Sequence, residues 1–495
     1  MILTSKGEEF EDSANSSIIE FKKACKEIAQ EFKKIPKSEN IRVISHLDAD
    51  GISSAALIVK ALNRENRPYS LTILQQVKSE DVKKFSLEEA KNFIFTDLGS
   101  NQISQFLNNF NGKKVFILDH HQPENSKNVF DFDLLKSRGI YHLNPHLFSI
   151  DGSSQISGSG VSYYFVKELN SENEDLAHIA LIGTLGDIQE PSESILNSEI
   201  LELAKKHKRI SVTKGLKVFG AQTKPLHMAL VQSTEIYIPG VTGSESGAIQ
   251  FLKQINIEPK EGNRWRRIID LSEEELKRLV EGIIMLRLNE ENPEDIIGDI
   301  YLLNDEEEGS TLKDAREFAT VLNACGRLNR ASLGVGACLG DKRLKNMAVE
   351  TLKDYKKEIV SALKWFEQNR NSNNVIQEPG FLIINAEDKI LSTIIGTVAS
   401  IISKSGIVPK NTFVVAMARM MNDYTKISIR YSGNNLKDED YNLKEIISRV
   451  IDDFEGEAGG HINAAGAYIP VSQESMFIEK LRVVLRRFAL EEKID

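Results

Sequence analysis

The chain has 495 residues, of which 41% are apolar and 27% are charged, a balance that excludes wholesale disorder. Its formal net charge of −10 argues against a protein that coats nucleic acid through bulk positive charge. The 3 cysteines are too scattered to predict a disulfide framework or a CxxC zinc site, and no apolar run of about 18 residues predicts a membrane span. Because the N-terminal stretch is polar and acidic, unlike a secretory signal, we expect a cytoplasmic protein.

The first predicted element is a helix over residues 16–36, where apolar residues recur at helical spacing up to Pro36. We take residues 1–40 as an N-terminal helical segment. From Ile41 onward, short apolar runs (41–46, 92–96 and 113–118) end in polar clusters and are followed by helical stretches, including 158–169 and 175–187. This alternation predicts a parallel α/β domain over residues 41–195.

The rest of the chain divides into two predicted regions. Residues 196–310 contain several amphipathic stretches and are predicted to form a mostly helical connector. Residues 311–495 are predicted to form a second, smaller α/β domain, with strands near 381–386, 411–419 and 426–432, a glycine-rich turn and a terminal helix. No repeat of about 20–50 residues is present.

Polar clusters follow the predicted strands of the first domain. The sequence HLDADG carries His46, Asp48 and Asp50 directly after a strand. Alternate residues at a strand end point the same way, so the three side chains are expected to face one point. One imidazole and two carboxylates suit Mn²⁺ or Mg²⁺. An Asp-rich turn that caps a helix is the alternative interpretation of this cluster alone.

Three further positions add acids and histidines. Asp97 follows NFIFT, the triplet Asp119-His120-His121 follows VFIL, and Asp187 closes the helix that ends in GTLGD. Each acid alone is equally consistent with a helix cap. Jointly they recur where an open parallel sheet gathers its ligand-binding loops. Two metal ions about 3.5–4 Å apart need six or seven such ligands, one of them bridging. The candidate ligands are His46, Asp48, Asp50, Asp97, His120 and Asp187, a set suited to hydrolysing a phosphate ester.

The second α/β domain contains the sequence GGHINAAG. Gly459 and Gly460 would let the backbone approach an anion closely, and His461 can donate a hydrogen bond to a phosphate. A plain tight turn is the alternative. Arg327 and Arg430 are candidate phosphate-binding residues, although either is equally consistent with a surface arginine.

Together these segments resemble the DHH phosphoesterase superfamily. HLDADG, FTDLG, ILDHH and GTLGD resemble its four N-terminal motifs, GGHINAAG resembles the hallmark of its C-terminal DHHA1-type domain, and NACGR resembles a motif of the RecJ branch. The resemblance runs from about residue 41 to 470 and is greatest to archaeal RecJ-like exonucleases, including the GINS-associated nuclease. Bacterial RecJ often has Asp where this chain has His46. The resemblance implies a DHH domain joined to a DHHA1-type domain, with the active site in the cleft between them.

The resemblance also implies roles for the residues. Asp50, Asp97, His120 and Asp187 would hold one Mn²⁺ ion, and His46, Asp48 and the shared Asp97 a second, with Mg²⁺ as an alternative. His121 would contact the scissile phosphate and Asp119 would orient the histidine pair. The facing domain would grip the nucleic-acid backbone through Arg327, Arg430, Gly459, Gly460 and His461.

The leading hypothesis is a two-metal exonuclease that degrades single-stranded DNA from its 5′ end in replication or repair. A second hypothesis keeps the chemistry but places it on RNA, short oligonucleotides from the 3′ end, or cyclic dinucleotides. A third is a scaffold associated with GINS of the replicative helicase, and a fourth is a family-II-type pyrophosphatase. A competent residue at every expected ligand position favours an enzyme over a scaffold.

Overall fold

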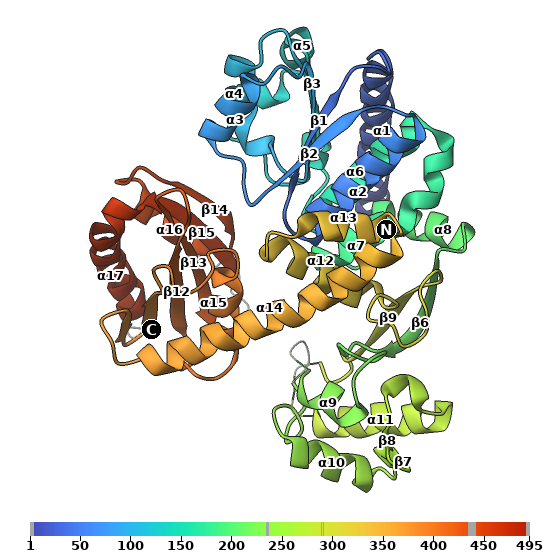
Figure 1. The fold of residues 1–495 in the computed structure, drawn as a ribbon, viewed down its shortest axis with the longest axis vertical. Coiled ribbons are helices and arrows are strands. Elements are labelled where there is room, and N and C mark those ends of the chain that lie inside the picture. The colour runs from blue at the N-terminus through green and yellow to red at the C-terminus, as the bar shows by residue number, and fades with distance from the viewer. Residues whose placement is uncertain (1–3, 234–236, 289, 291, 434–441, 492–495) are drawn as a thin grey trace. The chain divides into compact units, whose positions relative to one another are not determined.

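The computed structural model describes residues 4–233, 237–288, 290, 292–433 and 442–491, and it leaves out the side chains of residues 4–14, 461, 490 and 491. The chain divides into two compact units, residues 1–352 and 353–495, which are described separately below. Figure 1 shows the course of the chain and the element labels used here. Within the described ranges, no helix is both long enough and apolar enough to cross a membrane.

The first unit is built around a five-stranded parallel sheet in the order β2-β1-β3-β4-β5. The sequence patterns predicted three of these strands and missed β2 and β5, neither of which is followed by a cluster of acids and histidines. The strands are β1 (Ile41–His46), β2 (Tyr69–Leu74), β3 (Asn92–Thr96), β4 (Lys114–Leu118) and β5 (Ile140–Leu143). The residues of the inner strands β1, β3 and β4 are largely buried, as expected for a sheet covered on both faces, whereas the edge strand β2 is partly exposed.

Helices cover both faces of this sheet (Figure 1). Side chains from three short helices share one core with the sheet residues Phe95 and Ile117; these helices are α3 (Ser79–Ser86), α4 (Ile103–Asn109) and α5 (Phe132–Ser137). On the other face Phe32 meets Phe116 of β4 and Phe165 edge-on. That face is covered by α1 (Thr4–Lys33), α2 (Ala49–Arg64) and α6 (Gly158–Leu169), with α7 (Ala177–Gly186) against α2 and α6. The predicted N-terminal helix is therefore confirmed as α1.

The strand register brings the carboxyl ends of the sheet together. Ser45 pairs with Thr96, Thr96 pairs with Leu118, and Leu118 pairs with Leu143. The residues that follow β1, β3 and β4 therefore leave the sheet at one edge, which is where the sequence places its acids and histidines.

Residues 196–310 contain helices, as predicted, but also strands that the sequence analysis missed. After α8 (Ile195–Lys206), β6 (Ile210–Leu216) pairs antiparallel with β9 (Ile297–Leu303) to form a two-stranded ribbon. Between these strands lie α9 (Leu226–Val231), α10 (Glu245–Gln254), β7 (Lys260–Glu261), β8 (Arg264–Trp265) and α11 (Glu273–Leu286). Their apolar core contains only residues 216–296, so this region is an inserted subdomain with a core of its own.

The first unit continues past the boundary that the sequence predicted at residue 311. Two further helices, α12 (Ala315–Arg327) and α13 (Ala331–Cys338), pack against α2. The structure divides the chain only after Leu352, within α14 (Lys342–Asn369). Residues 311–352 therefore belong with the parallel sheet and not with the second unit, because the buried face of α12 is occupied by α2 and α7.

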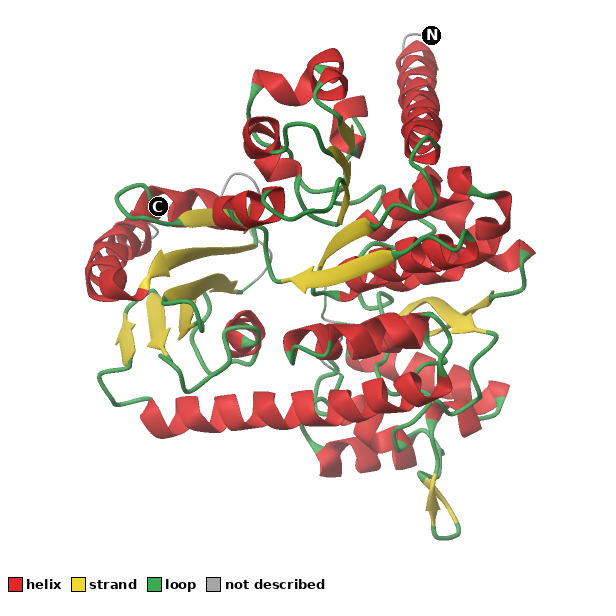
Figure 2. Cartoon of the chain, turned by 45° about the horizontal axis from the view of Figure 1, so that its top comes forward, coloured by secondary structure: helices red, strands yellow, loops and turns green. Residues whose placement is uncertain are grey.

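The second unit is a smaller α/β fold around a six-stranded sheet in the order β10-β11-β12-β13-β15-β14. Figure 2 shows the strands of the chain in yellow and its helices in red. Its apolar core joins residues such as Val415 and Ile429 to helices α16 (Leu443–Ile451) and α17 (Glu474–Glu491). The predicted glycine-rich turn is a hairpin of two strands, β14 (Glu457–His461) and β15 (Ala464–Pro470). The other elements are β10 (Val375–Glu378), β11 (Phe381–Asn385), α15 (Ile395–Lys404), β12 (Thr412–Arg419) and β13 (Tyr424–Ser432).

Candidate metal centre

A first group of ligand atoms lies after β1 and β3. One ligand atom each from His46, Asp48 and Asp97 lies within 4.8 Å of the others. His46 Nδ1 is 2.9 Å from Asp48 Oδ2 and 3.3 Å from Asp97 Oδ2. On the other side of its ring, His46 Nε2 lies 3.1 Å from the carbonyl oxygen of Gln75, and the hydrogen bond it donates there leaves Nδ1 with a lone pair that can bind a cation.

A second group comprises Asp50, His120 and Asp187, whose ligand atoms also lie within 4.8 Å of one another. His120 Nε2 is 3.3 Å from Asp97 Oδ1 and 3.7 Å from Asp50 Oδ2. His120 Nδ1 donates to the carbonyl oxygen of Gly152 at 2.7 Å, which turns Nε2 toward the carboxylates. The expectation that His46, Asp48 and Asp50 face one point is wrong, because Asp50 lies in the first turn of α2 and joins the second group.

Asp97 lies between the two groups. Its side chain is 1% exposed, and its backbone is in the left-handed region at φ 57°. Its Oδ1 atom is buried and has no hydrogen-bond donor in the described part of the chain. A buried carboxylate oxygen without a donor is costly unless a cation binds it. With Oδ2 next to His46 and the orphaned Oδ1 next to His120, the Asp97 carboxylate fits a bridging metal ligand.

Small residues make room for the carboxylates. A Cβ on Gly158 would lie 2.7 Å from Asp97 Oδ1, and a Cβ on Gly183 would lie 2.7 Å from Asp50 Oδ1. The backbone N–H groups of Gly158 and Ser159, at the N-terminus of α6, donate to Asp50 at 2.6 and 2.9 Å. The sequence analysis read this Gly-Ser-Gly segment as an ordinary helix start and missed its contact with an acid 108 residues away.

The carboxylates of the site repel one another. Burial and the charges of Asp97 and Asp187 raise the pKa of Asp50 to about 8. Burial likewise raises the pKa of Asp187 to about 6, with Asp97 adding to the shift. Although burial opposes a charged imidazole, the neighbouring carboxylates hold the pKa values of His46 and His120 well above the usual range. The site therefore concentrates negative charge that a divalent cation would balance.

His121 is held differently from His120. Its Nδ1 lies 2.8 Å from Asp119 Oδ1, which also accepts the backbone N–H groups of both histidines at 2.8 and 3.2 Å. Burial opposes a charge on the ring, but Asp119 outweighs it and raises the pKa of His121. Asn144, which the sequence analysis did not single out, is fully buried and donates to the carbonyl oxygen of His121 at 2.9 Å. The geometry also permits His121 to share a cation with Asp97 and His120.

Gln189 is a further residue that the sequence analysis missed. Its Nε2 atom donates to Asp187 Oδ2 at 2.8 Å and to the Gly152 carbonyl oxygen at 2.9 Å. Its own Oε1 accepts from Asn197 at 3.0 Å, and the side chain is 3% exposed. Because the same Gly152 carbonyl accepts from His120, Gln189 links two members of the second group. The sequence feature that could have identified Gln189 as part of the site is its position two residues after Asp187.

The motif NACGR lies against the loop that carries Asp48. Asn323 Oδ1 accepts the backbone N–H of Ala49 at 3.0 Å. A Cβ on Gly326 would lie 1.5 Å from the carbonyl oxygen of Leu47, so only glycine fits. The sequence analysis placed Arg327 on the facing domain. That placement is wrong, since Arg327 ends α12 in the first unit, next to Gly326.

The other predicted substrate-binding residues lie in the second unit. Arg430 on β13 donates from Nε to Ser400 Oγ at 2.9 Å and from Nη1 to the Ile429 carbonyl oxygen at 2.8 Å. Gly459 and Gly460 lie in β14, and a Cβ on Gly459 would meet open space. His461 ends that strand, and its side chain lies outside the described part of the chain.

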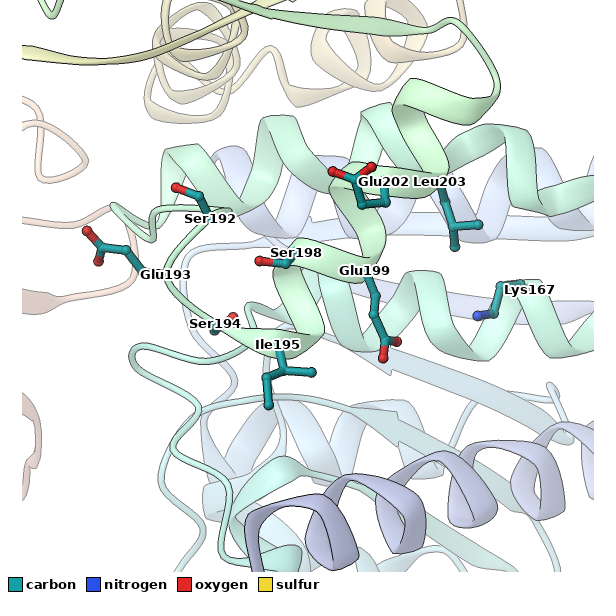
Figure 3. Close-up of a pocket in the computed structure, with 9 residues that line it drawn as sticks. All are labelled: Lys167, Ser192, Glu193, Ser194, Ile195, Ser198, Glu199, Glu202 and Leu203. Carbon is teal, nitrogen blue, oxygen red and sulfur yellow. The ribbon is translucent and has the colours of Figure 1, made fainter. Parts of the chain in front are cut away.

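The first unit also has a surface pocket of about 740 Å³ around the start of α8 (Figure 3). Its lining contains none of the candidate metal ligands and is mainly acidic, serine-bearing or apolar. The lining residues are Lys167, Ser192, Glu193, Ser194, Ile195, Ser198, Glu199, Glu202 and Leu203. Glu199 is already paired with Lys22 at 2.6 Å and accepts from Tyr164 at 2.8 Å. The pocket is therefore separate from the candidate metal centre.

Three family models match successive parts of the chain. They are the DHH family N-terminal domain at residues 40–184, the DHH-CID domain at 218–300 and the DHHA1 domain at 380–487. An uncharacterized protein of Methanocaldococcus jannaschii is 30% identical over 449 residues, covering 90% of this chain and 93% of the relative. The chain belongs to the DHH family. The inserted subdomain is the region that the DHH-CID model matches.

Solved structures show the same fold. RecJ of Thermus thermophilus in complex with Mn²⁺ aligns with a TM-score of 0.56 at 16% identity, over 94% of this chain. The chain spans 55% of that RecJ chain. Cdc45 of Entamoeba histolytica aligns with a TM-score of 0.60 at 12% identity, over 97% of this chain and 99% of the other. The RecJ-like DHH-DHHA1 architecture that the sequence predicted is confirmed.

Proposed function

We propose that this DHH-family protein is a metal-dependent exonuclease that hydrolyses phosphodiester bonds of single-stranded DNA, from 5′ to 3′. The observation that carries the proposal is the buried, donor-free Oδ1 of Asp97 between two groups of ligand atoms. Paired metal sites that share a carboxylate are suited to in-line displacement at phosphorus. The direction and the substrate rest on the resemblance to RecJ-like exonucleases.

The residues would hold two ions as two sets. His46, Asp48 and Asp97 form one set, and Asp50, Asp97, His120 and Asp187 form the other. Mixed imidazole and carboxylate ligands favour Mn²⁺, with Mg²⁺ as an alternative. When bound, the ions would supply a hydroxide nucleophile at neutral pH and offset the charge of the phosphate. The manganese complex of the Thermus RecJ supports this choice of metal.

His121 would contact the scissile phosphate. Its ring is fixed through Nδ1 by Asp119, so Nε2 is the nitrogen that remains to donate. The raised pKa of His121 favours the protonated ring, and a charged donor binds a phosphate oxygen more strongly than a neutral one. Asp119 is then a positioning residue for both histidines.

Further contacts to the nucleic-acid backbone are assigned to both units. Arg327 would act from the first unit, beside the loop that carries Asp48. Arg430, Gly459, Gly460 and His461 would act from the second unit. A guanidinium can bind a phosphate through two parallel hydrogen bonds, and glycines let the backbone approach an anion.

Two alternatives remain to be separated by experiment. The same centre could act on RNA, short oligonucleotides or cyclic dinucleotides. The fold shared with Cdc45 over nearly the whole chain favours a role as an assembly partner, for which GINS of the replicative helicase is the predicted partner. A complete set of ligand residues argues against a scaffold without activity, because nothing in a scaffold requires buried like charges.

The test uses single-stranded DNA and RNA, each labelled separately at its 5′ and 3′ ends, with wild type and Asp97→Ala in Mn²⁺. We expect early release of the 5′-terminal nucleotide from DNA by the wild type only. Trimming of RNA alone would move the substrate to RNA, and cleavage of neither strand would contradict the proposal. A fully active Asp97→Ala protein would contradict the two-metal assignment.

A further inference from the structure

The turn after Asp187 carries a residue that does not suit its backbone. Ile188 has φ 60°, in the left-handed region. A β-branched side chain in this region is strained, because its branched Cβ crowds the backbone. Among the described non-glycine residues with positive φ, Ile188 is the one with a β-branched side chain.

Packing of the side chain does not compensate for the backbone strain at Ile188. The Ile188 side chain is 91% exposed, so it buries almost no apolar surface in the folded chain. Its backbone is nevertheless fixed. The N–H groups of Ile188 and Gln189 bond to the carbonyl oxygens of Leu185 and Thr184 at 3.2 and 3.1 Å, which closes α7 in a Schellman motif.

Five other α-helices of the first unit end with the same pair of hydrogen bonds. The residue in the position of Ile188 is Asn66 after α2, Lys208 after α8, Asn256 after α10, Asn329 after α12 and Gly340 after α13. Asparagine tolerates the left-handed region well, and an unbranched lysine tolerates it better than isoleucine does. The isoleucine is therefore an exception to the way this chain ends its helices.

The exception lies beside the candidate metal centre. Ile188 follows Asp187, whose carboxylate groups with Asp50 and His120, and precedes Gln189, which is buried and bonded to Asp187. Hydrogen bonds therefore hold the residues on both sides of Ile188 beside the candidate metal centre. Residues with strained backbone conformations cluster at active sites and ligand clamps, which makes Ile188 a candidate contact residue.

We propose that Ile188 contacts the base of the nucleotide whose phosphate lies at the candidate metal centre. The inference rests on the proposed function and adds a residue that sets substrate affinity. An aliphatic side chain offers no hydrogen bond or charge to a phosphate, but it can pack against the flat apolar face of a base, as apolar side chains do when they enter a base stack. Such a contact is insensitive to which base is present.

The test compares Ile188→Gly with Lys208→Gly, a matched change at the same position of the same motif after α8. Glycine relieves the backbone strain in both, so both variants should melt at or above the temperature of the wild type. Ile188→Gly should raise KM for single-stranded DNA about tenfold with kcat changed less than about twofold, because only binding is lost. Lys208→Gly should leave KM unchanged. Mn²⁺ affinity, measured by calorimetry, should be unchanged in both.

Two further measurements separate a base contact from a structural role. Ile188→Val keeps an apolar side chain and should keep KM within about twofold of wild type. A strand with abasic residues at the cleaved end should bind the wild type more weakly, and Ile188→Gly should add no further loss. Two results would overturn this inference while leaving the proposed function intact, provided that the wild type is active. One is an unchanged KM in Ile188→Gly, and the other is a rise in KM from Ile188→Gly that is equally large on the abasic strand. A wild type that cleaves no strand overturns the proposed function and this inference with it.

Discussion

The two units of the chain differ in whether their buried charges are balanced by a partner of opposite charge. At the carboxyl edge of the first sheet, Asp50 and Asp97 are each at most 2% exposed, and the charge of Asp97 acts against a charge on Asp50. In the second unit the core is apolar, and its buried acid Glu474 is neutralised by Arg419 at 2.9 Å. A folded chain tolerates buried charges of one sign only where a bound ion or ligand balances them. The contrast therefore locates the functional centre and predicts that the two units respond differently to the same perturbation.

The largest expected effect is on turnover. Asp97→Asn keeps the size of the side chain but removes the charge shared by the two ligand groups. We expect nuclease activity to fall by at least about a thousandfold, because losing a metal bridge removes transition-state charge stabilisation. Initial rates on end-labelled single-stranded DNA in Mn²⁺ measure this. Circular dichroism should show an intact fold, and a folded variant with a normal rate would contradict the site.

The next effect is on the stability of the first unit alone. In Gly326→Ala the new methyl group would overlap the carbonyl oxygen of Leu47, so the loop and α12 must separate. We expect the free energy of unfolding of the first unit to fall by about 3 kcal/mol or more. Calorimetry should show the transition of the first unit displaced and the transition of the second unit unchanged. Equal displacement of both transitions would argue that the units do not unfold separately.

Adding and removing metal should produce a smaller, pH-dependent shift. In the metal-free protein, Asp50 with a pKa of about 8 and Asp187 with a pKa of about 6 bind protons that the unfolded chain does not, since the ordinary value is 3.8. The raised pKa values of His46 and His120 act in the same direction. Because the folded state binds more protons, the free energy of unfolding should fall as pH rises from about 6 to 8.

Mn²⁺ should reverse that loss. At a hundredfold excess over its dissociation constant it should stabilise the first unit by about 2.7 kcal/mol. Thermal melts at several pH values, with EDTA or Mn²⁺, measure both effects. A metal-free protein that becomes more stable between pH 6 and 8 would contradict the electrostatic account of the site.

The smallest effect concerns the second unit. Glu378 bonds Arg482 and Arg486 on α17 at 2.8 and 2.6 Å, but all three side chains are partly exposed. Glu378→Gln should lower the melting temperature of the second unit by only about 2 °C or less, because solvent screens exposed ion pairs. Calorimetry should show this small shift in the transition of the second unit, with Mn²⁺ affinity unchanged. A change in Mn²⁺ affinity would show that the two units are coupled.

The sequence predicts those strands and motifs that can be recognised from residues adjacent in the chain. The apolar runs before HLDADG, FTDLG and DHH identified β1, β3 and β4, and the parallel sheet followed from their alternation with helices. Strands β2, β5, β6 and β9 were missed because they are short or partly exposed and lack the continuous apolar runs that mark β3 and β4. Propensity cannot identify strands whose pairing partner is far along the chain.

For the site, the sequence identified the residues that carry chemistry and missed those that place them. Asp97, His120 and Asp187 stand out as ligand types at strand or helix ends. Gly158 and Gln189 do not, because Gly158 acts by lying against the distant Asp97, and Gln189 links Asp187 to the distant carbonyl oxygen of Gly152. Arg327 was assigned to the wrong unit for the same reason, since the face that α12 buries is decided by contacts with α2 and α7.

The hydrogen bond from Ala49 to Asn323 has a consequence for the order in which the chain acquires its structure. It joins residues 274 positions apart, and the whole DHH-CID insertion lies between them. On a ribosome adding about 5–20 residues per second, the loop that carries Asp48 waits tens of seconds for its last neighbour. The insertion, with a core of its own, can fold during that interval. The loop that carries Asp48 would therefore reach its final contacts only after the inserted subdomain has formed, so the candidate metal centre would be among the last parts of the first unit to assemble.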